Sequence, residues 1–359
     1  MYIRVLKNRN VRYYMIGASF SNLGNVIAGF AFLFLASDLT ESNVHTTGMV
    51  ISQVFPYLLF GLIGGVIGDW VNKKKLMIMM DLLRGLTIIS LVFLYHFDQI
   101  SYWYLIVVSF LIHSMGCFFN PAHRAILPMI TNVEDRTAVN SLLDSVTRGA
   151  TVLGPIVSVT LLHTIGVRHF FTFDAVTYLL SAFLIYKIQI NDVNHNTVKE
   201  RTIFSIYHAF KEFGVRARNH VPVRNLLIVT FVMVFLNTWV WQVGLLLQLK
   251  DTIPNPEEWY SILLGWYGIT VIFVNGSIPF IWKRLKITHY LAASIVWGLG
   301  IFIIGFAYSL PIYFVGVLVA AIGLPISGLS RVYLLQEYLP KDMLGRGFSF
   351  NAFLLYLSI

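Results

Sequence analysis

An acid and a base stand one helical turn apart in an otherwise apolar part of this chain. Asp144 and Arg148 lie within the segment 139–164, which is long enough to cross a bilayer as a helix. Residues four apart share one face of a helix, and an acid that precedes a base is the favourable order for an ion pair. Because a charge inside a bilayer is costly, it indicates a function. We expect Asp144 to carry a proton, with Arg148 stabilising its ionised form until the two separate.

Two alternative roles for the buried charges stay open. Asp144 and Arg148 could form a permanent ion pair that bridges helices. The proton could instead be carried by Asp38 or Asp174, near the outer ends of the segments 13–37 and 168–187, although neither has a cationic neighbour along its own helix. A carboxylate at the end of a span can also be simply hydrated.

A second group of charges follows a glycine-rich helix end. In the stretch 61–75, GLIGGVIGDWVNKKK, the glycines fall three or four residues apart, so another helix can approach closely. Asp69 then stands at the membrane edge, and Lys73, Lys74 and Lys75 follow before the next apolar segment. A phosphate-binding loop follows a strand and opens a helix, which does not suit glycines inside an apolar run. The stretch therefore predicts a tight hairpin between two membrane helices.

Polar amides and aromatic side chains form two further groups. Asn22 and Asn25 are three apart in the first apolar segment, and Asn237, Trp241 and Gln242 cluster in the seventh. Such side chains suit the binding of a bulky, amphipathic and poorly charged molecule. Hydrogen bonding between helices would account for the same residues.

The elements that position these residues are membrane-spanning helices. The chain has 359 residues, of which 57% are hydrophobic and only 12% charged, and its mean hydropathy is +0.72. Soluble domains carry about 25% charged residues. We predict an eleventh, incomplete span from about residue 347 and ten complete spans at 13–37, 47–68, 76–96, 102–120, 139–164, 168–187, 223–248, 260–282, 288–308 and 311–335.

The basic residues alternate between the two sides of these spans. One side receives nearly all the lysines and arginines of the loops, whereas the other side has only Arg168 and Lys250. The positive-inside rule therefore places the N-terminus and the loop 188–222 in the cytoplasm. The net charge of +9 reflects this topology and contact with lipid headgroups, so we expect no nucleic-acid partner.

The long polar loop divides the chain into two parts. We expect a six-helix bundle over 1–187, a cytoplasmic loop over 188–222 and a second bundle over 223–359. Two stretches of the first part, 65–75 and 128–141, match 276–286 and 336–349 at offsets of 211 and 208 residues, as in transporters built from repeats. By this repeat Ile359 falls midway through a span. Because a half-span leaves carbonyl groups unsatisfied in the membrane, we expect the second bundle to be truncated.

Apolar residues recur at helical spacing inside the central loop. They predict an amphipathic helix on the inner leaflet, with a solvated linker helix as the alternative. The residues that define it are Ile203, Ile206, Tyr207, Phe210 and Phe213.

The glycine-rich hairpin resembles the signature loop between the second and third helices of the major facilitator superfamily. The corresponding residues here are Gly65, Asp69, Trp70, Asn72, Lys73 and Lys74. The resemblance implies a conformational latch between the two halves of a transporter. We expect its members to be Gly65, Asp69, Lys73 and Lys74, joined by Asp81 and Arg84 of the third span.

The fifth span resembles the glycine and proline motif of superfamily antiporters through Gly149, Gly154 and Pro155. Proline removes a backbone hydrogen bond and glycine allows close packing, so this helix can bend. An ordinary kinked helix is the alternative. Drug–proton exporters often carry an arginine four residues before a glycine of the fourth helix, but Ile112 precedes Gly116 here.

Four further stretches resemble the branch of macrolide-efflux and siderophore-exporter proteins. They are 81–84 (DLLR), 120–128 (NPAHRAILP), 174–178 (DAVTY) and 221–227.

The resemblance implies an all-α membrane protein with two helical bundles, normally of twelve spans. We expect a monomeric exporter in the plasma membrane, which moves a small hydrophobic or amphipathic compound, such as an antibiotic, siderophore or metabolite, by proton antiport with alternating access. Its partners are this substrate, protons and the lipid bilayer, with no cofactor and no metal. An uncoupled facilitator or importer is the alternative. A membrane-embedded lipid-modifying enzyme is a weaker one, since the sequence offers neither paired histidines at metal-binding spacing nor a nucleophile with an evident base.

Overall fold

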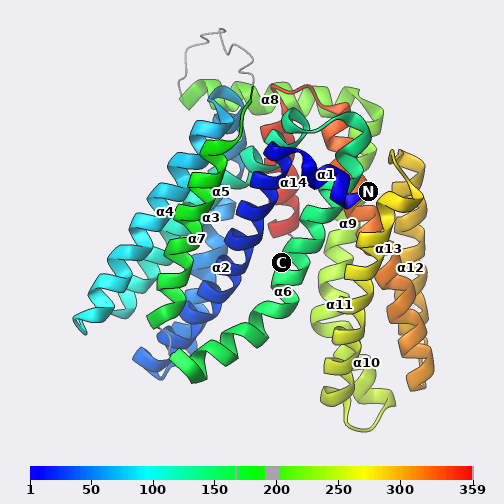
Figure 1. Cartoon of the computed structure of the whole chain (residues 1–359). Helices are drawn as coiled ribbons and strands as arrows, with labels where there is room; N and C mark the ends of the chain where they lie inside the picture. Colours follow the sequence, from blue (N-terminus) through cyan, green and yellow to red (C-terminus); the bar gives the residue numbers. More distant parts are fainter. Residues whose placement is uncertain (166–167, 191–202, 358–359) are drawn as a thin grey trace.

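The structure, a computed structural model, describes residues 1–165, 168–190 and 203–357, and these ranges contain helices and no strand (Figure 1). The helices before the central loop are α1 (Tyr2–Lys7), α2 (Arg9–Thr40), α3 (Asn43–Trp70), α4 (Lys73–His96), α5 (Tyr102–Ile130), α6 (Arg136–Ile165) and α7 (Arg168–Lys187). Those after it are α8 (Ile203–Asn219), α9 (Val221–Trp239), α10 (Leu245–Thr252), α11 (Pro256–Ile281), α12 (Ile287–Gly305), α13 (Leu310–Tyr338) and α14 (Leu344–Leu357). The short turns are η1 (Val133–Asp135) and the π-helical η2 (Val240–Gly244).

Every predicted span coincides with a helix of the structure. In the described residues, eight helices are long and apolar enough to cross a membrane, or nine if the bent pair α8–α9 counts as one span. The eight are α2, α3, α4, α5, α7, α11, α12 and α13. The other predicted spans coincide with α6, which carries charges, with α9, η2 and α10 in succession, and with the shorter α14. The all-α membrane fold is as predicted.

The hairpin between α3 and α4 turns within two residues. Helix α3 ends at Trp70, Val71 is extended, and Asn72 precedes α4. The Asn72 side chain accepts a hydrogen bond of 2.9 Å from the backbone N–H of Lys75 and so caps the first turn of α4. The cap lets the chain reverse at once, which brings Asp69 and Lys73 together.

The helices form two groups, α2–α7 and α9–α14, which we call the first and the second group. Helix α8 lies across one end of both groups, and the helix axis bends by 100° between α8 and α9 (Figure 1). We call this end the α8 end. Of the residues that define the predicted apolar face of α8, Phe213 is buried and Tyr207 is exposed, so the contact of this helix with the membrane stays a prediction.

The two groups meet chiefly through two helix pairs. Helix α14 packs against α3, and α6 packs against α11. From the α8 end the two groups diverge along their length (Figure 1). The two groups therefore lie nearer each other at the α8 end than at the opposite end (Figure 1).

Candidate functional site

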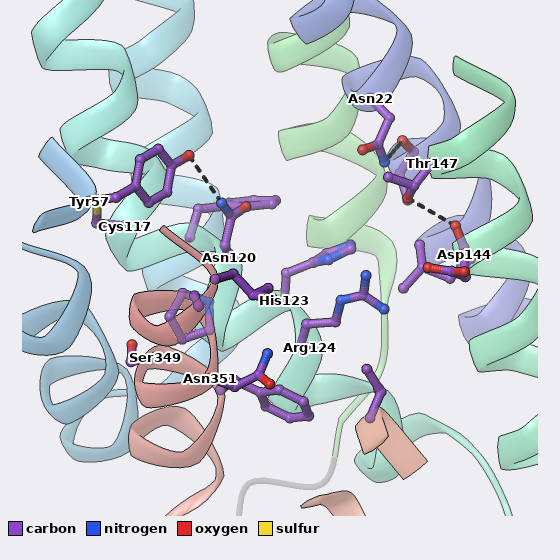
Figure 2. A pocket seen from close by; sticks show the side chains of 18 of the residues that line it. Asn22, Tyr57, Cys117, Asn120, His123, Arg124, Asp144, Thr147, Ser349 and Asn351 are labelled. Atoms are coloured by element: carbon purple, nitrogen blue, oxygen red, sulfur yellow. Dashed lines mark hydrogen bonds between the residues drawn. The ribbon is translucent and has the colours of Figure 1, made fainter. Parts of the chain in front are cut away.

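A cavity of about 570 Å³ lies between the two groups (Figure 2). Helices α2–α6 line it from the first group, and α13 and α14 from the second. Asn22 and Asn25 of α2 belong to its lining, where the sequence placed them. In Figure 2, Asn120, His123 and Arg124 of α5 point into the same space as Asn22.

Asp144 joins the two groups at the wall of this cavity. Its Oδ2 accepts a hydrogen bond of 2.7 Å from Arg148 Nε, so the predicted ion pair along α6 is present. The same oxygen accepts a second hydrogen bond of 2.6 Å from Asn275 Nδ2. Asn275 is a fully buried residue of α11. The carboxylate therefore bonds to its own helix and to a helix of the other group, and it loses the second bond if the groups separate here.

Four arginines line the cavity, with Asp144 as the one acid among the lining residues of the described chain. They are Arg84 of α4, Arg124 of α5, Arg148 of α6 and Arg331 of α13. The sequence predicts a loop at Arg124, because the apolar run ends near residue 120. In the structure α5 continues to Ile130, and the extra turns carry His123 and Arg124 to the cavity wall.

Asp69 binds the first turn of α14, near the α8 end. Its Oδ1 accepts from the Gly345 N–H at 2.6 Å, and its Oδ2 accepts from the backbone N–H and Nε of Arg346 at 3.0 and 3.2 Å. Lys73 Nζ lies 3.9 Å from Oδ1. The first N–H groups of a helix lack partners within it, so a carboxylate is a favourable cap. We call this interaction, with Gly65 behind it, the α3–α14 contact.

The structure does not bring Lys74, Asp81 or Arg84 to Asp69. Lys74 Nζ lies 5.5 Å from the centre of the Tyr186 ring. Arg84 Nη1 lies 3.4 Å from Asp81 Oδ1, and this buried pair is beside the cavity. The reason is depth, because Asp81 is eight residues beyond Lys73 and a helix rises about 12 Å over that distance.

The sequence of this chain matches a known family along nearly its whole length. The sequence profile described as Major Facilitator Superfamily matches residues 14–359. The chain belongs to the Major Facilitator Superfamily. It is therefore a transporter and not an enzyme, as the hairpin motif predicted.

Relatives of this transporter include exporters. It is 27% identical over 203 residues to the Bacillus subtilis protein named "Putative bacilysin exporter BacE", covering 56% of this chain and 49% of that one. It is 26% identical over 157 residues to macrolide efflux protein A of Streptococcus pyogenes, covering 43% and 38%. The matched region thus spans about half the length of the first relative.

Solved structures share the fold of this facilitator. A bacterial homologue of the iron transporter ferroportin, crystallised in an outward-facing state, superposes with a TM-score of 0.75 at 15% identity. The match covers 97% of this chain and 89% of that one.

The predicted bending motif of this facilitator lies within α6. A Cβ on Gly154 would meet Val26 of α2, so this glycine allows close packing of two helices. Gly149 has open space around it instead. Pro155 lies within the helix, and its side chain is outside the described residues. Helix α6 changes direction along its length in Figure 1, although its function as a hinge stays a prediction.

Asn237 and Trp241 lie outside the lining of the cavity between the two groups. Asn237 Oδ1 accepts hydrogen bonds from Trp241 Nε1 at 2.9 Å and from Trp297 Nε1 at 3.2 Å. These bonds join α9, η2 and α12, so the amide is satisfied between helices of one group. The side chain of Gln242 lies outside the described residues. Hydrogen bonding between helices, the alternative to substrate binding, describes this cluster.

The other candidate proton carriers, Asp38 and Asp174, differ in their surroundings. Asp38 is exposed at the end of α2. Asp174 is buried and lines a second cavity of about 150 Å³ together with Arg84 and His113. In the described residues no group of three or more His, Cys, Asp or Glu side chains could hold a metal ion.

Proposed function

We propose that this transporter exports a small amphipathic compound across the plasma membrane by proton antiport with alternating access. The observation that carries the proposal is Asp144 at the cavity wall, bonded to Arg148 and, across the groups, to Asn275. An ionisable residue within membrane helices is costly unless it functions. The exporters among the relatives support the outward direction.

Asp144 couples the proton to the motion in this proposal. A carboxylate that gains a proton loses its charge attraction to Arg148, and its hydrogen bond from Asn275 is no longer charge-assisted. Protonation therefore favours separation of α6 from α11. Substrate and proton then leave the cavity on opposite sides, because only one end of the space between the groups is open at a time.

The α3–α14 contact acts as the latch of the closed α8 end. Gly65, Asp69 and Lys73 form it with the first turn of α14, and the turn must leave Asp69 when this end opens. Gly149, Gly154 and Pro155 give α6 a place to bend during the same change.

The α8 end faces the cytoplasm in this proposal. The lysines and arginines of the loops gather on that side, as the positive-inside rule requires. The exposed apolar side chains of α8, such as Tyr207, then rest on the inner leaflet. We expect the transporter to work as a monomer.

A substrate screen followed by one substitution tests the coupling. Efflux of many compounds from cells that express the protein, with and without a protonophore, identifies a transported compound. We expect Asp144→Asn to abolish its uphill, protonophore-sensitive export and to preserve downhill exchange in liposomes. Asp98→Asn, at an exposed loop position, is the matched control and should transport normally.

Two outcomes would contradict the proposal. Uphill export by Asp144→Asn at the unaltered rate would make Asp144 a structural residue, and Asp174 would be the next carboxylate to test. Export by the unaltered protein that is insensitive to the protonophore would favour an uncoupled facilitator.

A further inference from the structure

The charges of the central cavity do not balance. Its lining contains the four arginines named above and, among the described residues, a single carboxylate. Two of the arginines have acidic partners. Arg148 bonds to Asp144, and Arg84 pairs with Asp81 while its guanidinium lies 4.8 Å from the centre of the Phe119 ring.

Arg124 and Arg331 have no such partner. Within the described residues, no hydrogen bond or ion pair engages either guanidinium, and Arg331 Nε is buried without a hydrogen-bond partner. Both lie close enough to Asp144 to feel its charge, but Arg148 and Asn275 occupy the Oδ2 of that carboxylate. Both residues are only partly exposed. A cation without a partner inside membrane helices carries a cost that a bound anion would offset.

The two free guanidinium groups come from opposite sides of the cavity. Arg124 belongs to α5 of the first group and Arg331 to α13 of the second. Figure 2 shows Arg124 reaching into the space between the helices. Guanidinium groups bind carboxylate, sulfonate and phosphate oxygens with paired, charge-assisted hydrogen bonds. The charge of Arg124 acts on Arg331, so an anion between the two would be attracted by both.

The rest of the lining is apolar enough for the body of such a molecule. Phe119, Leu143, Val332, Phe348 and Leu355 line the same cavity. A volume of about 570 Å³ is within the range of small-molecule sites.

We propose that the transported compound is an amphipathic organic anion, whose acidic group binds between Arg124 and Arg331. This inference rests on the proposed function, because it takes the cavity as the transport path. It differs from the poorly charged molecule that the amides alone indicated. Fixed positive charge in a cavity with apolar walls attracts anions and repels cations, so the same two residues exclude cationic drugs.

Equilibrium binding of a matched pair of probes tests the proposal. Dansylglycine carries a carboxylate, and its methyl ester has the same ring system without the charge. Fluorescence titration of the purified protein should show that the acid binds about tenfold more tightly than the ester, since charge-assisted hydrogen bonds differ from neutral ones by roughly that factor. Equal or tighter binding of the ester to the unaltered protein overturns the proposal.

Substitutions then assign the preference to the two arginines. Arg124→Gln and Arg331→Gln should each remove most of the preference for the acid, whereas Arg216→Gln, on the exposed face of α8, should keep it. Arg331→Lys retains the charge and should keep part of the preference, which separates loss of charge from loss of fold. A preference that survives in both glutamine variants overturns the assignment. Binding needs no gradient, so failure of proton-coupled export would leave this result unaffected.

Discussion

The α3–α14 contact and the packing of α11 against α6 occupy equivalent places in the two repeats. By the offsets of the internal repeat, Asp69 corresponds to Phe280, and Gly345 corresponds to Thr137. Each contact joins the end of one helix to the start of a helix from the other group. The same place in the fold is therefore closed by different chemistry in the two repeats.

Buried ions close the first contact. Asp69 and Arg346 are 4% and 5% exposed, and the carboxylate takes three hydrogen bonds from the first turn of α14. Arg346 Nη1 continues to Glu212 of α8 at 3.1 Å. The central-loop helix is thereby tied to the same contact.

At the place that corresponds to Asp69, hydrogen bonds between neutral groups close the second contact, whereas the bond from Asn275 to the Asp144 carboxylate joins α11 and α6 at the cavity wall. Thr137 Oγ1 donates to the Lys283 carbonyl at 2.8 Å, Tyr2 OH donates to the Gly276 carbonyl at 2.7 Å, and Ser141 Oγ donates to the Asn275 carbonyl. Phe280, in the place of Asp69, is 66% exposed and makes no ion pair. Removing one partner of a buried ion pair costs about 3–5 kcal/mol, against about 1 kcal/mol for a neutral hydrogen bond. We therefore expect the first contact to control opening of the α8 end.

The largest effect is expected from Asp69→Asn. The amide cannot balance Arg346 and Lys73, so the closed α8 end should lose about 3 kcal/mol, roughly a hundredfold in the equilibrium between the two states. Turnover should fall strongly while substrate affinity changes only a few-fold, measured as exchange rates and as binding.

The matched control for this substitution is Asp98→Asn. It removes an exposed carboxylate at a loop position. Loss of binding by Asp69→Asn with normal turnover at saturation would place Asp69 in the substrate site instead of the latch.

A smaller effect is expected from Gly65→Ala. A Cβ there would meet the backbone carbonyl of Gly345 and the Ser349 side chain, so α3 and α14 must move apart. Overpacking typically costs about 1–3 kcal/mol. Gly276→Ala is the control in the other repeat, because nothing lies within 4 Å of the added Cβ. Equal loss of exchange rate in both variants would contradict the difference in packing between the two contacts.

The smallest effect is expected from Thr137→Val. This substitution keeps the shape of the side chain and removes the hydrogen bond to Lys283, which is worth about 1 kcal/mol. The exchange rate should change less than about fivefold. A loss as large as that of Asp69→Asn would show that the two contacts contribute equally to closure.

Hydropathy and local motifs were enough to predict the helices. Segment boundaries such as 168–187 match α7, and the tight hairpin follows from Gly65, Asp69 and the lysines beside it. The pairing of Asp144 with Arg148 was predictable too, because residues four apart meet on any helix. These features depend on neighbours along the chain, which the sequence states directly.

The partners of the charged and polar side chains depended on packing between helices. Asn275 reaches Asp144 from a helix more than a hundred residues away, and Arg346 meets Asp69 from the other group. Asn237 resembled a cavity residue in sequence but bonds to Trp297.

The sequence by itself determined a multi-pass helical transporter with a charged pair in its fifth span. The tertiary structure decided which charges face the cavity, because it extended α5 far enough to bring Arg124 into the same cavity lining as Arg331. The physical reason is that burial in a membrane is set along each helix by hydropathy, whereas the balance of charge in a cavity is set by side chains from several helices.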